Sequence, residues 1–145
     1  MTRPPYLVVD SSVSLKWALD DEEDTDNALA LRNDGIIGRF QMVAPVLWAY
    51  EVANGLVTAV RRDRITPSDG LEALAHLTDL GVRLADPEEV ACYRTALRFG
   101  IAAYDAAYLA LAEKLGAVLW TGDHKLWEAV GSTHSFVRWI GDYPA

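Results

Sequence analysis

Cysteine and histidine are scarce in this chain of 145 residues, and their scarcity narrows the possible chemistry. The single cysteine, Cys92, cannot form a disulfide within the chain, and residues 89–93 predict a small buried side chain in a helix. The three histidines include no His-x-x-x-His pair, whereas a zinc site usually recruits His or Cys. We therefore expect any metal site to be built from oxygen ligands.

Long apolar runs are also missing. The longest are broken by polar residues well short of the about 18 residues that a membrane span needs, and residues 1–5 lack the apolar stretch of a signal peptide. With 51% hydrophobic residues, the chain can still bury a substantial core. We expect one cytoplasmic domain over residues 1–145, with no membrane partner.

Basic residues are few, with 13 Lys and Arg against 21 Asp and Glu, for a net charge of −8. This is the wrong sign for sequence-independent attraction to phosphate. A cation bound among the acids would reverse the local field. A nucleic-acid partner would therefore have to be bound through local contacts, because the net charge of the protein does not attract it.

What the chain does have is a regular alternation of short apolar runs and helical patterns. Strands are predicted at residues 6–9, 40–44, 82–85, 117–120 and 135–140, and helices at 11–18, 25–31, 46–62, 66–80, 88–99, 101–113 and 126–130. No Asn-Gly or Asp-Gly hairpin signal joins the strands. The pattern predicts an α/β fold, a three-layer sandwich with a mostly parallel central sheet.

Four acidic residues occupy positions where such a fold places ligands. Asp10 and Asp123 follow predicted strands, and ligands of open α/β sheets bind at the carboxyl ends of strands. Asp105 opens an apolar helix, where a charge needs a partner, a cation or the helix N-terminus. Glu51 shares a helix face with Asn54. If the four converge, their repulsion raises their pKa values or requires a cation, and oxygen ligands favour Mg²⁺ or Mn²⁺.

Each acid also has an ordinary interpretation when it is taken alone. Asp10 and Asp105 can cap helices, Glu51 can be a solvated helix residue, and Asp123 can be a turn residue. The combination favours a shared metal site.

Four motifs carry a family resemblance along almost the whole chain. They are Val-Val-Asp-Ser-Ser-Val at 8–13, Pro45 with Glu51, Asn54 and Leu56, Tyr-Asp-Ala-Ala-Tyr-Leu-Ala-Leu-Ala at 104–112, and Thr-Gly-Asp at 121–123 followed by Leu126. In this order they resemble the PIN-domain ribonucleases, and most of all the VapC-type toxins of toxin-antitoxin pairs.

The resemblance implies a magnesium-dependent endoribonuclease, the toxin of a type II toxin-antitoxin system. It implies catalytic roles for Asp10, Glu51, Asp105 and Asp123, with Asp10, Asp105 and Asp123 as metal ligands and Glu51 as a ligand or the residue that positions water. Ser12, Asn54 and Thr121 match supporting positions, and Ser12 can equally be an N-cap. A homodimer and a groove for a cognate antitoxin are also implied.

Contacts to the RNA phosphates must come from the few basic residues. The candidates are Lys16, Arg61, Arg62, Arg64 and Lys125, which can also be ordinary solvated charges. Two other hypotheses are non-catalytic: a phospho-accepting receiver module, and a PIN fold that has lost activity and only binds a partner. A receiver pairs adjacent acids after its first strand, whereas serines follow Asp10. The presence of all four acids argues against lost activity.

Overall fold

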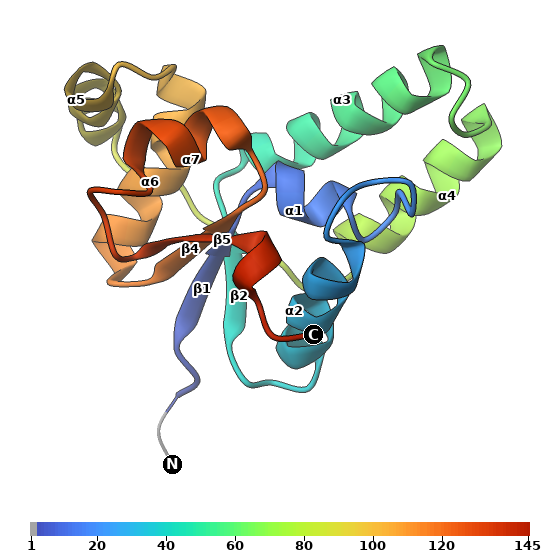
Figure 1. Cartoon of the computed structure of the whole chain (residues 1–145), viewed down its shortest axis with the longest axis horizontal. Helices are drawn as coiled ribbons and strands as arrows, with labels where there is room; N and C mark the ends of the chain where they lie inside the picture. The colour runs from blue at the N-terminus through green and yellow to red at the C-terminus, as the bar shows by residue number, and fades with distance from the viewer. Residues whose placement is uncertain (1–2) are drawn as a thin grey trace.

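The short apolar runs of the chain form one parallel sheet, and the segments between them form helices (Figure 1). The computed structural model describes residues 3–145, so Met1 and Thr2, which begin the segment expected to lack a signal peptide, lie outside the described residues. The strands are β1 (Tyr6–Val9), β2 (Gln41–Ala44), β3 (Arg83–Leu84), β4 (Val118–Thr121) and β5 (Val137–Trp139). The helices are α1 (Ser11–Leu15), α2 (Thr25–Ile36), α3 (Leu47–Arg61), α4 (Pro67–Thr78), α5 (Glu89–Phe99), α6 (Ala103–Leu115), α7 (His124–Val130) and the 3-10 helix η1 (Ile140–Asp142).

The sheet has the order β3-β2-β1-β4-β5, and all neighbouring strands run parallel. In the middle of the sheet, Val8 pairs with Val43 on one side and with Leu119 on the other, and all three side chains are buried. The chain builds outward from β1 through β2 to β3 and then returns to β4 on the opposite side of β1. The carboxyl ends of β1 and β4 therefore form the switch point where such sheets bind ligands.

Helices cover both faces of the sheet. In Figure 1, α5, α6 and α7 lie on one side and α1 to α4 on the other, as right-handed crossovers require for this strand order. The predicted three-layer α/β sandwich is confirmed, and its sheet is wholly parallel. Within residues 3–145, no helix combines the length and hydrophobicity that a membrane crossing demands.

Two helices supply most of the helical part of the core. The stripe predicted on α3, with Trp48, Val52, Leu56 and Ala59, is buried. The middle of α6, residues 106–112, is buried on all sides, as its nearly all-apolar sequence predicts. These two helices carry Glu51 and Asp105, so each acid is held by an element that the core fixes in place.

Some predicted element ends were wrong, for local reasons. Helix α1 stops at Leu15 instead of residue 18, and its N-cap is Asp10 rather than Ser12. Helix α2 runs on to Ile36 and so includes Gly35. Gly35 packs closely against Met42: a Cβ atom on residue 35 would lie 3.0 Å from the Met42 side chain.

The last strand and the cysteine also differ from prediction. Strand β5 is shorter than predicted, since the chain turns into η1 at Ile140. Cys92 is only partly buried in α5, although a buried side chain was predicted.

Candidate active site

Asp10 is the buried centre of the site. It directly follows β1, is 4% exposed, and its Oδ1 accepts hydrogen bonds from the Val13 amide at 3.2 Å and from the Ser12 hydroxyl. Burial raises the pKa of Asp10 to about 6, and repulsion from Asp123 adds to the effect, while hydrogen bonds from Ser12, Thr121 and Val13 oppose it. Asp10 is therefore a carboxyl group whose negative charge the protein alone does not fully compensate.

Ser12 connects the carboxyl ends of β1 and β4. Its hydroxyl donates to Asp10 and accepts from the Gly122 amide at 2.9 Å. A Cβ atom on residue 122 would lie 2.8 Å from Cε of Lys16, so any larger residue there would displace the buried Lys16 side chain. Ser12 is thus neither an N-cap nor a free hydroxyl: it holds the turn that carries Asp123 next to Asp10.

Asp123 lies in that turn and caps α7. Its Oδ1 accepts from the Lys125 amide at 2.9 Å and from the Leu126 amide at 3.4 Å, and its own amide donates to Oγ1 of Thr121 at 3.0 Å. Thr121 is fully buried, and its hydroxyl also lowers the pKa of Asp10. One buried hydroxyl therefore acts on the Asp10 carboxyl group and on the backbone of Asp123.

Asp105 approaches from the first turn of α6, where it is partly exposed. Burial and then repulsion from Asp123 raise its pKa, while Lys125 partly offsets them. Asp105 was predicted to be a charge in an apolar setting, but the buried part of α6 begins only at Ala106, and Asp105 lies close enough to Asp123 and Lys125 for both to shift its pKa.

Glu51 completes the group from α3. Its Oε1 accepts a hydrogen bond from the Tyr108 hydroxyl at 2.5 Å and a longer one from the Ser11 hydroxyl at 3.5 Å. Burial raises the pKa of Glu51, as does repulsion from Asp105 and Asp123, while the hydrogen bonds from Tyr108 and Ser11 lower it.

The four acids thus lie within one another's electrostatic field. Asp123 acts on each of the other three, and Asp105 acts on Glu51, so the mutual repulsion expected from the sequence is present. Within residues 3–145, no three acidic, histidine or cysteine side chains are already close enough together to hold one ion. The backbone brings the acids to one edge of the sheet, but their carboxyl groups stay apart.

The other predicted residues are distributed unevenly around this group. Asn54 is exposed on α3, one turn beyond Glu51, and Lys125 is exposed beside Asp105. Arg61 and Arg62 are exposed at the far end of α3, which extends away from the sheet in Figure 1. Only Lys125, of these basic residues, is positioned to act directly on the acids.

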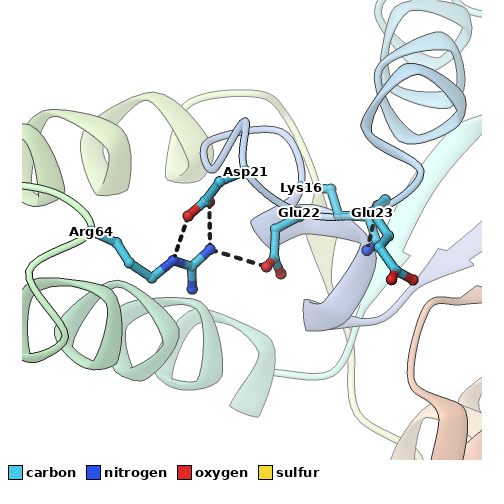
Figure 2. Close-up of polar contacts among 5 residues, drawn as sticks. All are labelled: Lys16, Asp21, Glu22, Glu23 and Arg64. Carbon is cyan, nitrogen blue, oxygen red and sulfur yellow. Dashed lines mark hydrogen bonds and ion pairs between the residues drawn. The ribbon is translucent and has the colours of Figure 1, made fainter.

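Two basic residues predicted to hold phosphate have partners inside the protein (Figure 2). Lys16 is buried, and its ammonium donates to the Glu23 carbonyl at 2.7 Å. Arg64 donates to both carboxylate oxygens of Asp21 and to Glu22, joining the loop after α1 to the loop after α3. In this structure neither side chain is free to hold phosphate, and both instead fix the loop between α1 and α2.

Tyr108 and Ser11 were not among the residues predicted to belong to the site. The sequence carried a signal for Tyr108, because it lies one helical turn after Asp105 and so shares its helix face. What the spacing could not show is that the hydroxyl reaches Glu51 on another helix.

The fold and these acids define a class of protein. The family model described as PIN domain matches residues 7–131, which is most of the chain. The chain therefore belongs to the PIN-domain family. The receiver-like alternative is wrong, and the strand order agrees: β1 lies between β2 and β4, whereas receivers have the order 2-1-3-4-5.

Within this family the chain is of the VapC type. The VapC ribonuclease Mb0985 of Mycobacterium bovis and ribonuclease VapC9 of Mycobacterium tuberculosis are each 33% identical to it over 124 residues, covering 83% of this chain and 87% of theirs. Ribonuclease VapC3 of Pyrobaculum aerophilum is 38% identical over 86 residues, covering 57% of this chain and 66% of its own. The crystal structure of PAE2754 from Pyrobaculum aerophilum has the same fold, with a TM-score of 0.69 at 24% identity over 96% of this chain and 92% of that one.

Proposed function

We propose that this protein is a divalent-metal-dependent endoribonuclease and the toxin of a type II toxin-antitoxin pair, acting in the cytoplasm. The observation that carries the proposal is the convergence of four acids at the switch point of the sheet, with Lys125 as the one predicted basic residue that acts on them. The ribonuclease names of its VapC relatives support RNA as the substrate.

The residues fit a hard divalent cation. Carboxylate oxygens are the ligands that Mg²⁺ and Mn²⁺ prefer, and carboxylates that repel one another gain from a shared positive charge. We assign Asp10, Asp105 and Asp123 as the ligands. When bound, the cation lowers the pKa of a coordinated water and neutralises charge on the phosphodiester.

The protein's own residues then have separate tasks. Ser12 and Thr121 hold Asp10 and Asp123 in position through hydrogen bonds, so these ligands lose little freedom on binding. Glu51 either adds a further ligand to the cation or positions the attacking water. Lys125 contacts the RNA phosphate beside Asp105, while Asn54, Arg61 and Arg62 contact more distant parts of the RNA along the exposed side of α3.

The partners have candidate surfaces. Exposed apolar side chains on α5 and at the start of α6, namely Val90, Tyr93, Leu97 and Tyr104, form a patch suited to a homodimer. A groove between α3 and α4, lined by Leu56, Val57, Val60, Leu71 and Leu74, suits the apolar side of an antitoxin helix.

The homodimer surface is tested by a substitution on α5. Replacing Tyr93, which is 65% exposed, by glutamate should leave a folded monomer of 16.0 kDa in sedimentation equilibrium. A parent protein that is already monomeric would contradict the homodimer.

A cleavage experiment tests the activity. Purified parent protein and an Asp105→Asn variant are incubated with cellular RNA, with and without Mg²⁺, after circular dichroism has shown that both are folded. We expect fragments only from the parent with Mg²⁺, because the variant lacks a ligand that lies partly exposed and contributes little to the core. Equal cleavage by both proteins would refute the assignment. No cleavage by either would favour an inactive PIN fold that acts by partner binding.

A further inference from the structure

Tyr108 is a buried tyrosine whose hydroxyl faces the group of acids. The residue is 2% exposed, and it lies on the same face of α6 as Asp105, one turn further on. Its hydroxyl donates to Oε1 of Glu51 at 2.5 Å. A buried phenol needs a hydrogen-bond partner, but here the partner is a proposed catalytic carboxylate on a helix of the opposite layer.

The hydrogen bonds to Glu51 are one-sided. Tyr108 and Ser11 both donate to Oε1, and neither of these bonds uses Oε2. Glu51 also experiences repulsion from Asp105 and Asp123, which would turn a freely rotating carboxylate away from them. Donors fixed on one oxygen restrain that rotation, so the other oxygen keeps a defined direction.

We propose that Tyr108 is a positioning residue of the nuclease site: its hydroxyl fixes the Glu51 carboxylate against the repulsion of the neighbouring acids and thereby prepares Glu51 for the cation and its water. The inference rests on the proposed function, since it concerns the same site. It also explains why α6 places a tyrosine rather than a plain apolar residue at a position that is otherwise core.

The test compares two tyrosine variants. Tyr108→Phe removes the hydroxyl and keeps the ring, so core packing is retained. Tyr143→Phe is the matched control, because Tyr143 also donates to a carboxylate, that of Asp34, and Asp34 is not one of the four acids. Both variants lose one tyrosine-carboxylate hydrogen bond, and only Tyr108→Phe removes it from the site.

Three quantities are measured: the Mn²⁺ dissociation constant by electron paramagnetic resonance of free Mn²⁺, and kcat and KM for RNA cleavage. Tyr108→Phe should weaken Mn²⁺ binding and lower kcat, each by about 10-fold or more, while KM for RNA stays within about twofold, because groups that orient metal-site residues typically matter by such factors. Tyr143→Phe should match the parent in all three. In a Glu51→Ala background, Tyr108→Phe should change the Mn²⁺ dissociation constant no further, because the hydroxyl acts through Glu51.

Parent-like Mn²⁺ affinity and kcat in Tyr108→Phe would overturn the inference and leave Tyr108 as a core residue, while the proposed function stands. Additive effects of the Glu51 and Tyr108 substitutions on Mn²⁺ affinity would overturn it as well. If the parent binds Mn²⁺ but cleaves no RNA, the proposed function fails and the Mn²⁺ arm alone decides the role of Tyr108. If the parent does neither, both fail together.

Discussion

The Asp10→Asn variant is expected to be more stable than the parent at neutral pH without metal, by about 3 kcal/mol, and to be inactive as a nuclease. The stability gain follows from the pKa of Asp10, which is raised from 3.8 to about 6, since each pKa unit corresponds to about 1.4 kcal/mol. Asparagine is neutral at every pH, and its amide oxygen can still accept from Ser12 and Val13. Because the group is buried, solvent screening reduces the effect little.

The sign of the pH dependence is fixed by the direction of the shift. A carboxyl group with a raised folded-state pKa holds its proton more tightly in the native state, so ionisation costs the native state free energy. The cost is absent below pH 3.8, grows as the pH rises, and is complete above about pH 6. The advantage of Asp10→Asn in urea unfolding should therefore shrink steadily from neutral pH towards pH 4. A variant less stable than the parent at neutral pH would contradict this account.

Metal addition should remove most of the difference in unfolding free energy between the two proteins. If Asp10 is a ligand, Mn²⁺ at a hundred times its dissociation constant stabilises the parent by about 2.7 kcal/mol. The Asp10→Asn variant should gain much less, because it has lost a negatively charged ligand. An equal gain in both proteins would show that the cation binds elsewhere.

Local sequence was sufficient to locate the strand-end acids. Asp10 and Asp123 follow short apolar strands, and strand ends of a parallel sheet meet at one edge, so the fold class alone places both acids at that edge. Their proximity also requires β1 and β4 to be neighbours, which the strand order of the structure supplies. The buried stripe of α3 could also be predicted from the sequence, because helical spacing determines which side chains share a face.

Contacts between distant elements were not predictable in the same way. Periodicity shows which face a residue occupies but not what that face meets. Arg64 was expected to hold phosphate, yet it pairs with Asp21, 43 residues earlier in the chain. Tyr108 was read as part of an apolar helix, yet it hydrogen-bonds to Glu51, 57 residues away. Both contacts depend on how the loops and layers cross, which no single segment encodes.

A second prediction concerns how the phosphodiester bond of the RNA is broken. A site built of carboxylates around a divalent cation activates water. Attack by the RNA 2′-hydroxyl would need a general base, and no His or Lys side chain of the described residues forms a hydrogen bond to Asp10 or Glu51. Attack by water leaves a linear phosphate on one product, and the new oxygen comes from the solvent. Attack by the 2′-hydroxyl would instead leave a cyclic phosphate without solvent oxygen.

Mass spectrometry of the RNA fragments formed in oxygen-18 water therefore tests the central claim most directly. The parent with Mg²⁺ should yield linear terminal phosphates that carry one solvent oxygen, and Asp10→Asn should yield no fragments under the same conditions. Fragments that end in a cyclic phosphate, or cleavage that persists in Asp10→Asn, would contradict metal-dependent hydrolysis by these four acids.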